Sequence, residues 1–298
     1  MKTLILGASG MLGHQIYLKF KESKKFSSVK GVIREKKEFL KNYKFFNSAD
    51  IYDKVDFLKD GFQLIEKIIL KYKPDVVVNC VVIKPDIEAK VNEKECFLIN
   101  SFLPHFLARL LDLYKGKLIQ ISTDGVFRGI GGNYSEEDTP DADDLYGRSK
   151  FFGEVGYGNH LTIRTSIFGH EIAKRKTGLL EWLLSSPQKS LTGYTNSYFS
   201  GIPTNILAET IIKLIFLKTK DILNVGASKK ISKYELISII NKEYGLGKKI
   251  IPKKLSQGID RGLNVAKILK LKISLPNYSK MVREMREDFS RLKEKNGY

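Results

Sequence analysis

The chain has 298 residues, of which 42% are hydrophobic and 28% charged, as is typical of a folded globular protein. Its net charge is +18, but only 10 of its 51 basic residues are arginines, and the lysines are spread along the whole chain. Nucleic-acid interfaces usually concentrate arginine beside aromatic residues, so this distribution argues against a nucleic-acid partner.

Two cysteines, Cys80 and Cys96, and four scattered histidines show no spacing typical of metal ligands. We therefore expect no metal site and two reduced thiols. The apolar run that begins at Thr3 is too short for an export signal, and later runs such as residues 211–217 are too short to span a membrane. These features predict a cytoplasmic protein without a membrane partner.

The first half of the chain alternates short β-branched runs with longer helical periods, the pattern of a parallel sheet with crossover helices. We expect strands at residues 3–6, 29–33, 45–46, 75–79, 117–122 and 161–164, and helices at residues 11–21, 62–72, 93–114 and 145–155. The pattern predicts an α/β fold of the Rossmann type, with a doubly wound parallel sheet.

The pattern of expected elements changes after residue 168. Longer helices, separated by loops that contain glycine, are expected at residues 178–184, 203–216, 232–244 and 278–294. We therefore divide the chain into a large region at residues 1–168 and a smaller C-terminal region at residues 169–298. Because no linker separates the two regions, we expect them to interleave in one body.

A glycine-rich turn follows the first expected strand and opens the first expected helix. Gly7, Gly10 and Gly13 have the spacing of a dinucleotide-binding turn. The first glycine permits the tight turn, the second lets the backbone approach a pyrophosphate, and the third lets the helix pack on its strand. The helix N-terminus adds a partial positive charge that favours phosphate. A glycine turn with a purely structural role is the alternative interpretation.

The end of the second expected strand bears on the choice of nucleotide. NAD-binding folds usually place an acid there for the ribose 2′-hydroxyl, whereas an arginine receives the 2′-phosphate of NADP. Here Arg34 stands at the strand end and Glu35 follows it. Arg34 suits NADPH through bidentate pairing with phosphate. If Arg34 is only a surface cation, Glu35 favours NADH instead.

Tyr146 and Lys150 lie four residues apart on an expected helix and therefore on one helical face. We expect the ammonium group to lower the Tyr146 pKa toward neutral pH, which makes the phenol a usable acid or base. Thr123 and Ser122 end the fifth expected strand, at the sheet edge where ligands of parallel sheets bind. Either hydroxyl would donate to the oxygen that Tyr146 protonates. The alternative is a threonine that only satisfies local backbone.

These motifs in this order resemble the extended short-chain dehydrogenase/reductases, and within them the dTDP-4-dehydrorhamnose reductase family. The resemblance covers roughly residues 1–265 and includes the segments at 122–127, 134–140, 146–154, 201–204, 223–226 and 232–235. It implies an oxidoreductase that uses NADPH, or alternatively NADH, to reduce a 4-keto-6-deoxy sugar linked to a nucleoside diphosphate, in the synthesis of surface polysaccharide precursors. Residues 1–168 would then bind the cofactor, and the C-terminal region the substrate.

The resemblance also assigns individual residues. Thr123, Tyr146 and Lys150 would form the catalytic trio. The residues implied in cofactor binding are Gly7, Ser9, Gly10, Met11, Leu12, Gly13, Arg34, Asp56, Phe57, Cys80, Val81, Tyr146 and Lys150. Among them Asp56 and Phe57 would contact the adenine, and Cys80 and Val81 would line the ribose. Residues 169–198, with Glu181, Trp182, Tyr194 and Asn196, would shape the sugar pocket. For Trp182 the favoured alternative is a place in the hydrophobic core.

One difference from related nucleotide-sugar enzymes reduces the number of possible reactions. Nucleotide-sugar 4,6-dehydratases carry a glutamate where this chain has Gly125, so the base for elimination is missing. Two alternatives stay open. One is an NAD-dependent nucleotide-sugar 4-epimerase, which uses the same trio. The other is a non-catalytic dinucleotide-binding protein similar to the regulatory subunit of methionine adenosyltransferase. A homodimer is compatible with each of these functions.

Overall fold

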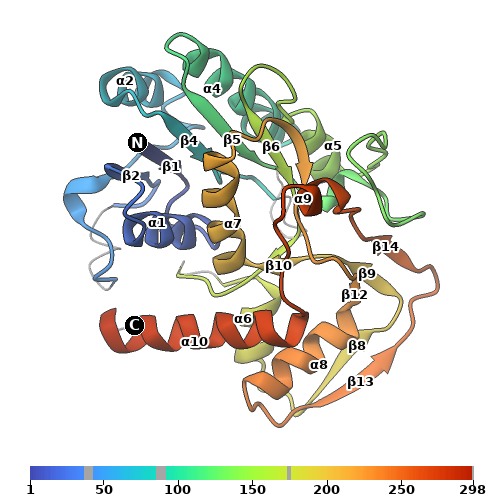
Figure 1. Ribbon diagram of the computed structural model, residues 1–298. Coiled ribbons are helices and arrows are strands. Elements are labelled where there is room, and N and C mark those ends of the chain that lie inside the picture. Colours follow the sequence, from blue (N-terminus) through green and yellow to red (C-terminus); the bar gives the residue numbers. More distant parts are fainter. Residues whose placement is uncertain (37–42, 85–91, 173–175, 297–298) are drawn as a thin grey trace.

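The computed structural model describes residues 1–36, 43–84, 92–172 and 176–296. Its centre is a seven-stranded sheet in the order β11-β6-β5-β4-β1-β2-β3 (Figure 1). Every neighbouring pair of strands is parallel. The chain runs outward from β1 in one direction through β2 and β3, and in the other through β4, β5 and β6. This confirms the predicted doubly wound α/β fold, whose ligand crevice lies beyond the carboxyl ends of the central strands.

The elements of the large sheet follow the predicted alternation closely. Its strands are β1 (Lys2–Leu6), β2 (Ser28–Val32), β3 (Ile51–Tyr52), β4 (Val76–Asn79), β5 (Lys117–Ile121), β6 (Leu161–Arg164) and β11 (Asp221–Asn224). The helices among them are α1 (Gly13–Glu22), α2 (Gln63–Tyr72), α3 (Glu93–Cys96), α4 (Leu103–Asp112) and α5 (Leu145–Phe151). Short 3₁₀ turns occur at η2 (Ser48–Asp50) and η4 (Asp124–Val126).

Two expected elements are corrected by the structure. Residues 45–46 do not form a strand; the outer strand is β3, and Phe46 is buried with its ring 4.8 Å from that of Tyr17. The apolar pair therefore reflects core packing rather than strand pairing. The single helix expected over residues 93–114 is divided, because a π-helical turn, η3 (Phe97–Phe102), separates α3 from α4. Such turns are rare and frequently lie at functional sites.

The C-terminal region supplies both its own small sheets and parts of the large one. Its helices are α6 (Leu179–Ser185), α7 (Thr204–Phe216), α8 (Lys233–Glu243), α9 (Ala266–Lys270) and α10 (Tyr278–Asn296). Its short strands are β8 (Ser190–Tyr194), β9 (Ser197–Phe199), β10 (Ile202–Pro203), β12 (Ile231–Ser232), β13 (Lys249–Lys253) and β14 (Ile259–Arg261), and β10 pairs with β7 (Ile167–Phe168) at the end of the large region. β11 joins the edge of the large sheet beside β6. The two regions therefore share one sheet.

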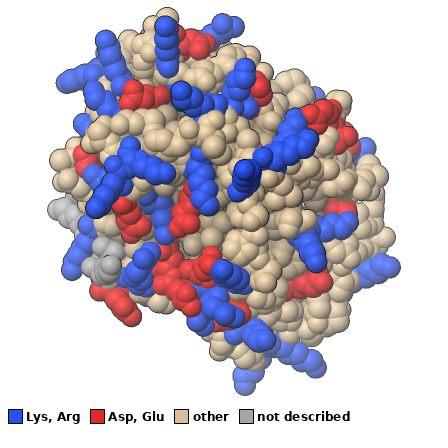
Figure 2. All heavy atoms as spheres, in the orientation of Figure 1, with Lys and Arg blue, Asp and Glu red and all other residues tan. Residues whose placement is uncertain are grey.

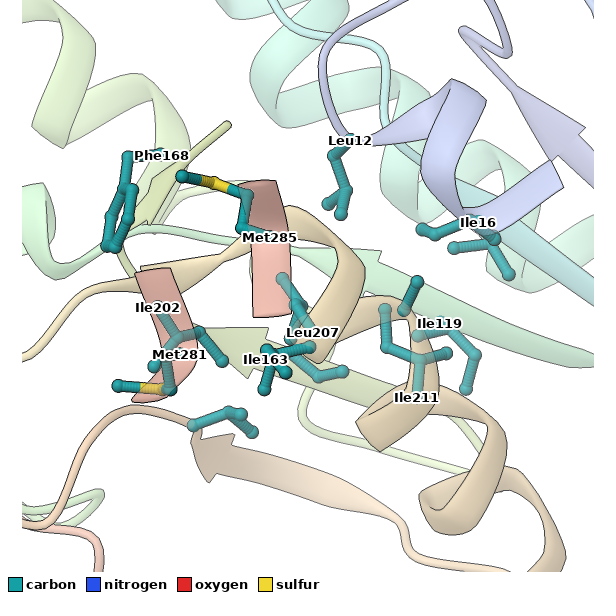
Figure 3. Close-up of a cluster of buried hydrophobic side chains, with 14 of the residues drawn as sticks. Leu12, Ile16, Ile119, Ile163, Phe168, Ile202, Leu207, Ile211, Met281 and Met285 are labelled. Carbon is teal, nitrogen blue, oxygen red and sulfur yellow. The ribbon is translucent and has the colours of Figure 1, made fainter. Parts of the chain in front are cut away.

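The main hydrophobic core joins these two regions (Figure 3). Ile16 of α1, Ile163 of β6, Leu207 of α7 and Met281 of α10 all belong to it and are fully buried. The core thus packs the helix that follows the glycine turn against helices from the end of the chain. Within the described ranges, no helix combines the length and the apolarity that a membrane crossing requires.

Candidate active site

The glycine turn lies directly after β1 and packs against itself. Gly7 has a φ of +74°, which favours glycine, and its N–H donates to the carbonyl oxygen of Val32 over 3.0 Å. A Cβ on Gly13 would lie 2.0 Å from the carbonyl oxygen of Gly7, so no side chain fits there. The N–H of Gly10 donates to the same oxygen over 2.9 Å. A tight turn with three glycines before a helix N-terminus fits the pyrophosphate of a dinucleotide.

Glu35, rather than Arg34, faces the glycine turn. The hydroxyl of Ser9 donates to the Glu35 carboxylate over 2.9 Å. Arg34 is exposed at the end of β2. The two alternative determinants of the nucleotide thus occupy different places: Glu35 contacts the turn, and Arg34 lies at the surface.

The remaining residues expected at the cofactor lie around the same strand ends. Phe57 is buried, with its ring edge-on to Phe62, while Asp56 accepts the N–H of Leu58 over 3.1 Å. Cys80 and Val81 follow β4 and lie beside Gly7, whose added Cβ would lie 3.3 Å from the Cys80 carbonyl carbon. Leu12 is buried in the core beneath the turn. Across the crevice, Met11 approaches the C-terminal region, with its methyl carbon 3.7 Å from a Cβ placed on Gly178.

Two glycines bring Thr123 and Tyr146 together. Thr123 follows β5, and its hydroxyl oxygen accepts the N–H of Gly125 over 3.0 Å. A Cβ on Gly125 would lie 3.2 Å from that oxygen and 3.6 Å from Cε1 of Tyr146. The side chains of Thr123 and Tyr146 therefore both border the space beside Gly125. Helix α5, which carries Tyr146, begins at the cap residue Asp144, whose carboxylate accepts the N–H of Gly147 over 2.7 Å.

The protonation state of Tyr146 differs from the sequence-based expectation. Burial is the largest influence and raises the pKa of Tyr146 to about 12, although the hydrogen bond from the Thr123 side chain acts in the opposite direction. The carboxylates of Asp124 and Asp144 raise the pKa further. The prediction of a Tyr146 pKa lowered toward neutral pH is therefore wrong for this structure. At neutral pH the phenol is protonated and available as an acid.

Lys150 points from α5 toward the end of β5. Its Nζ donates to the carbonyl oxygen of Ile121 over 2.6 Å. Burial lowers the pKa of Lys150 to about 8, and the nearby Glu154 and Cys80 only partly offset this. Cys80 is also beside the glycine turn, so Lys150 lies between the carboxyl end of β5 and the expected cofactor site. Burial likewise raises the pKa of Cys80 to about 12, which leaves its thiol unreactive.

A buried ion pair supports this end of the sheet. The Glu154 carboxylate accepts hydrogen bonds from Nε of Arg164 over 2.9 Å and from Nη2 of Arg164 over 2.8 Å. Both side chains are 2% exposed. Ser122 donates to the same carboxylate over 2.7 Å. The Ser122 hydroxyl is thus engaged with Glu154, which leaves Thr123 as the strand-end hydroxyl that faces Tyr146. The π-helical turn adds a second support, since Asn100 donates to the hydroxyl of Ser149 on α5 over 3.0 Å.

Three charged residues near the site were not assigned from the sequence. Asp124 is buried next to Thr123, and its pKa is raised by burial although Lys233 and Arg261 act against the shift. Lys233 lies at the start of α8, with its Nζ 3.4 Å from the centre of the Phe199 ring. Arg261 ends β14 and also acts on the Tyr146 pKa. The only available signal was the family-like motif around Lys233, because the sequence does not place β14 beside β5.

The residues expected in the sugar pocket have diverse environments. Glu181 is buried and accepts from His170 and from the backbone N–H of Glu171. Asn196 forms two hydrogen bonds with the backbone of Leu255. Trp182 and Tyr194 are exposed, so Trp182 is not part of the core. Glu181 and Asn196 are therefore engaged in hydrogen bonds within the protein, whereas Trp182 and Tyr194 are accessible to a ligand.

Known proteins resemble the chain over different lengths. Spore coat polysaccharide biosynthesis protein SpsK of Bacillus subtilis is 31% identical over 181 residues, which cover 59% of this chain and 63% of SpsK. The chain thus matches less than two thirds of that relative. Methionine adenosyltransferase 2 subunit beta of Danio rerio is 26% identical over 259 residues, 82% of this chain and 74% of that protein.

A solved structure and a family model extend the comparison to nearly the whole chain. The fold matches dTDP-4-dehydrorhamnose reductase of Bacillus anthracis in complex with NADP with a TM-score of 0.76 and 19% identity, over 97% of this chain and 99% of that one. The family model described as RmlD substrate binding domain matches residues 1–289. The chain therefore belongs to the RmlD substrate-binding-domain family, as the motifs had predicted.

Proposed function

We propose that this protein is an NADPH-dependent reductase of a nucleotide-linked 4-keto-6-deoxy sugar, acting in the synthesis of a surface polysaccharide precursor. Membership of the family and the resemblance to dTDP-4-dehydrorhamnose reductases support this activity. In this proposal residues 1–168 bind the cofactor, and residues 169–298 contribute the substrate side.

The observation that carries the proposal is the pairing of Thr123 with a protonated Tyr146 at the carboxyl end of β5. A reductase must deliver a proton to the oxygen that becomes an alkoxide, and a phenol with a pKa of about 12 holds that proton at neutral pH. The raised pKa therefore suits the direction of reduction better than the lowered pKa that we expected from the sequence.

The residues present fit a bound dinucleotide, which would supply the hydride for the carbonyl carbon. Gly7, Gly10 and Gly13 would hold its pyrophosphate, and Lys150 would lie at the nicotinamide ribose. Tyr146 donates its proton to the carbonyl oxygen, and Thr123 positions that oxygen through its hydroxyl. Lys150 provides positive charge next to the developing oxyanion.

The assignment of the substrate site rests on two positively charged side chains. Lys233 and Arg261 both act on Asp124, which adjoins Thr123. We assign to them the diphosphate of the nucleotide sugar, because guanidinium and ammonium groups pair strongly with phosphate oxygens. We place the protein in the cytoplasm, since its two free cysteines suit a reducing compartment.

NADPH oxidation with 4-keto-6-deoxy sugars linked to dTDP, UDP and GDP tests the proposal. We expect turnover with one nucleotide class, and a loss of roughly 10²–10⁴-fold in kcat for Tyr146→Phe with NADPH binding retained. Tyr157→Phe is the matched control, because Tyr157 bonds to His105 outside the site. Normal turnover by Tyr146→Phe would contradict the assignment of the acid.

The similarity to methionine adenosyltransferase 2 subunit beta supports a second candidate, a non-catalytic dinucleotide-binding subunit. That function predicts a stable complex with a partner enzyme and no NADPH oxidation with any of the keto-sugars. The same assay, combined with affinity purification of the full chain, separates the two functions.

A further inference from the structure

Charge at the surface does not single out the cofactor site of this protein. Figure 2 shows lysine and arginine side chains distributed over the visible face, with acidic side chains between them. Helix α1, which follows the glycine turn, begins at the N-cap residue Leu12 without a side-chain hydrogen bond, and its first turn carries no acid that would compete with a phosphate. Two buried polar residues, His14 and Gln15, stand in this first turn instead.

The imidazole of His14 holds the carbonyl group of Gly10. Its Nδ1 lies 2.9 Å from the carbonyl oxygen of Gly10, and its Nε2 lies 3.1 Å from Nε2 of Gln15. A carbonyl oxygen can only accept, so Nδ1 carries the proton and donates it, and Nε2 accepts from the Gln15 amide. The two contacts thus fix both the orientation of the completely buried ring and its tautomer.

His14 acts as a neutral donor. Burial is the largest influence on the pKa of His14 and lowers it to about 4. The hydrogen bond to Gly10 opposes this shift only in part. The carboxylates of Asp288 and Glu181 also oppose it, whereas His170 adds to it. The ring is therefore uncharged at neutral pH, so it can influence a bound phosphate only through the Gly10 peptide and not through its own charge.

Gly10 is the middle glycine of the turn, and hydrogen bonds hold it on both sides. Its N–H donates to the carbonyl oxygen of Gly7 over 2.9 Å, and its own carbonyl oxygen accepts the backbone N–H of His14 over 3.1 Å in addition to the ring. The peptide that joins Gly10 to Met11 is planar and trans, so the N–H of Met11 points in the direction opposite to this carbonyl. A fixed carbonyl therefore fixes the direction of the Met11 N–H.

We propose that His14 is a positioning residue for the cofactor pyrophosphate: by holding the Gly10 carbonyl, it directs the N–H groups of Met11 and Leu12 toward the phosphate oxygens. This inference rests on the proposed dinucleotide site and adds a residue that the glycine motif does not include. The N–H groups at a helix N-terminus have no acceptors within the helix, so their direction determines how well they bind an anion. A carbonyl that tilts would turn the Met11 N–H away from the pyrophosphate.

Direct titration of NADP into the full chain, without any sugar, tests this proposal. His14→Leu removes the donor at similar volume, His14→Asn retains an amide donor near the position of Nδ1, and Gln15→Met removes only the support of the ring. The matched control is His160→Leu, because His160 is equally buried and its Nδ1 accepts the N–H of Leu118 at the amino end of β5. ADP-ribose, which contains the pyrophosphate, is compared with adenosine 2′-phosphate, which lacks it.

We expect His14→Leu to bind NADP and ADP-ribose roughly tenfold more weakly, and Gln15→Met about threefold, because a hydrogen bond that orients the turn is lost or loosened. His14→Asn should recover most of the loss. Affinity for adenosine 2′-phosphate should stay unchanged, as should kcat at saturating NADPH. Urea unfolding should show His14→Leu and His160→Leu both destabilised, with only the first losing affinity for NADP.

Three results would overturn the proposal: wild-type affinity for NADP in folded His14→Leu, equal weakening of ADP-ribose and adenosine 2′-phosphate, or equal weakening in His160→Leu. If His14→Leu does not fold, Gln15→Met decides in the same way. A wild type that binds NADP but reduces no keto-sugar contradicts only the proposed function. A wild type that binds no dinucleotide contradicts both.

Discussion

Gly147 of α5 lies directly against the carbonyl oxygen of Gly125, so closely that a Cβ on Gly147 would be 2.3 Å from that oxygen. This contact fixes the helix that carries Tyr146 to the turn that carries Thr123. In the proposed reaction, the spacing of this helix and this turn determines whether the phenol and the hydroxyl reach the same substrate oxygen.

We therefore expect Gly147→Ala to impair activity more than folding. The added methyl group must push α5 away from the turn, at a cost of about 1–3 kcal/mol in the free energy of unfolding. A displacement of the phenol by about 1 Å lowers kcat by roughly 100-fold. Steady-state kinetics and urea unfolding measure the two effects. Gly131→Ala is the control, because its Cβ would have no neighbour closer than 3.9 Å, and equal losses in both variants would contradict the argument.

The pH dependence of reduction should follow Lys150. Its pKa of about 8 means that the ammonium group is charged below this pH and neutral above it, whereas Tyr146 keeps its proton up to about pH 12. We expect kcat/KM for reduction to fall as the pH rises through about 8, and Lys150→Met to abolish this limb along with most activity. A flat wild-type profile up to pH 10 would show that the charge on Lys150 is not required.

Lys150 also affects the free energy of unfolding, whose change with pH is opposite in direction to the change in activity. Its pKa is about 8 in the folded protein and 10.5 as the ordinary value, so the unfolded chain binds more protons between these limits. Stability contributed by this group therefore rises with pH across that window. Lys150→Met should be more stable than the wild type at pH 7, as measured by urea unfolding, and the difference should shrink toward pH 10.

The cofactor preference should depend on Glu35 and Arg34 in opposite directions. Glu35 holds the hydroxyl of Ser9 on the glycine turn, where its charge would oppose a 2′-phosphate. We expect Glu35→Gln to raise the ratio of kcat/KM for NADPH over NADH roughly tenfold, and Arg34→Gln to lower it by a similar factor. Lys36→Gln, an exposed neighbour, should leave the ratio unchanged. If neither variant moves the ratio, another residue selects the nucleotide.

Breaking the buried ion pair should affect both stability and the pH profile. Glu154→Gln leaves the Arg164 guanidinium buried without its counter-charge, which we expect to cost about 3–5 kcal/mol in unfolding experiments. Because Glu154 raises the pKa of Lys150, its loss should also move the alkaline limb of reduction below pH 8. A purely structural role would lower stability without moving this limb. Glu93→Gln provides the control.

Substrate affinity should depend on the two cations that act on Asp124. Lys233→Gln and Arg261→Gln are each expected to raise KM for the nucleotide sugar roughly tenfold, since a hydrogen bond between charged groups contributes about 1.5–3 kcal/mol. KM for NADPH should not change. Lys230→Gln is the control, because Lys230 is already paired with Asp260 at the surface. A rise in KM for NADPH alone would place these cations on the cofactor side.

The features that the sequence predicts well are those encoded locally. The spacing of Gly7, Gly10 and Gly13 predicts the turn because its requirements are largely local: Gly7 adopts a φ of +74°, and Gly10 and Gly13 both approach the carbonyl oxygen of Gly7 closely. The alternation of strands and helices likewise predicts the doubly wound parallel sheet. Tyr146 and Lys150 share a helical face for the same reason.

Features that depend on tertiary contacts were not predictable in this way. The Tyr146 pKa was predicted in the wrong direction, because burial outweighs the charge of a neighbour and burial is set by the whole fold. Arg261 comes beside Asp124 only because β14 pairs with β9 in a small sheet that has no strong pattern in the sequence. The pair at residues 45–46 has the composition of a strand but packs on Tyr17.

The π-helical turn η3 has a consequence for how this chain tolerates insertions and deletions. A widened turn accommodates one residue more than a regular helix, as if a single codon had been inserted there. Asn100 uses the resulting geometry to bridge Ile83 and Ser149, and a helix changes direction by about 100° per residue. Removing one residue from η3 would thus restore a regular helix while rotating this amide away from both partners, so we expect sequence length to be more restricted here than amino-acid identity.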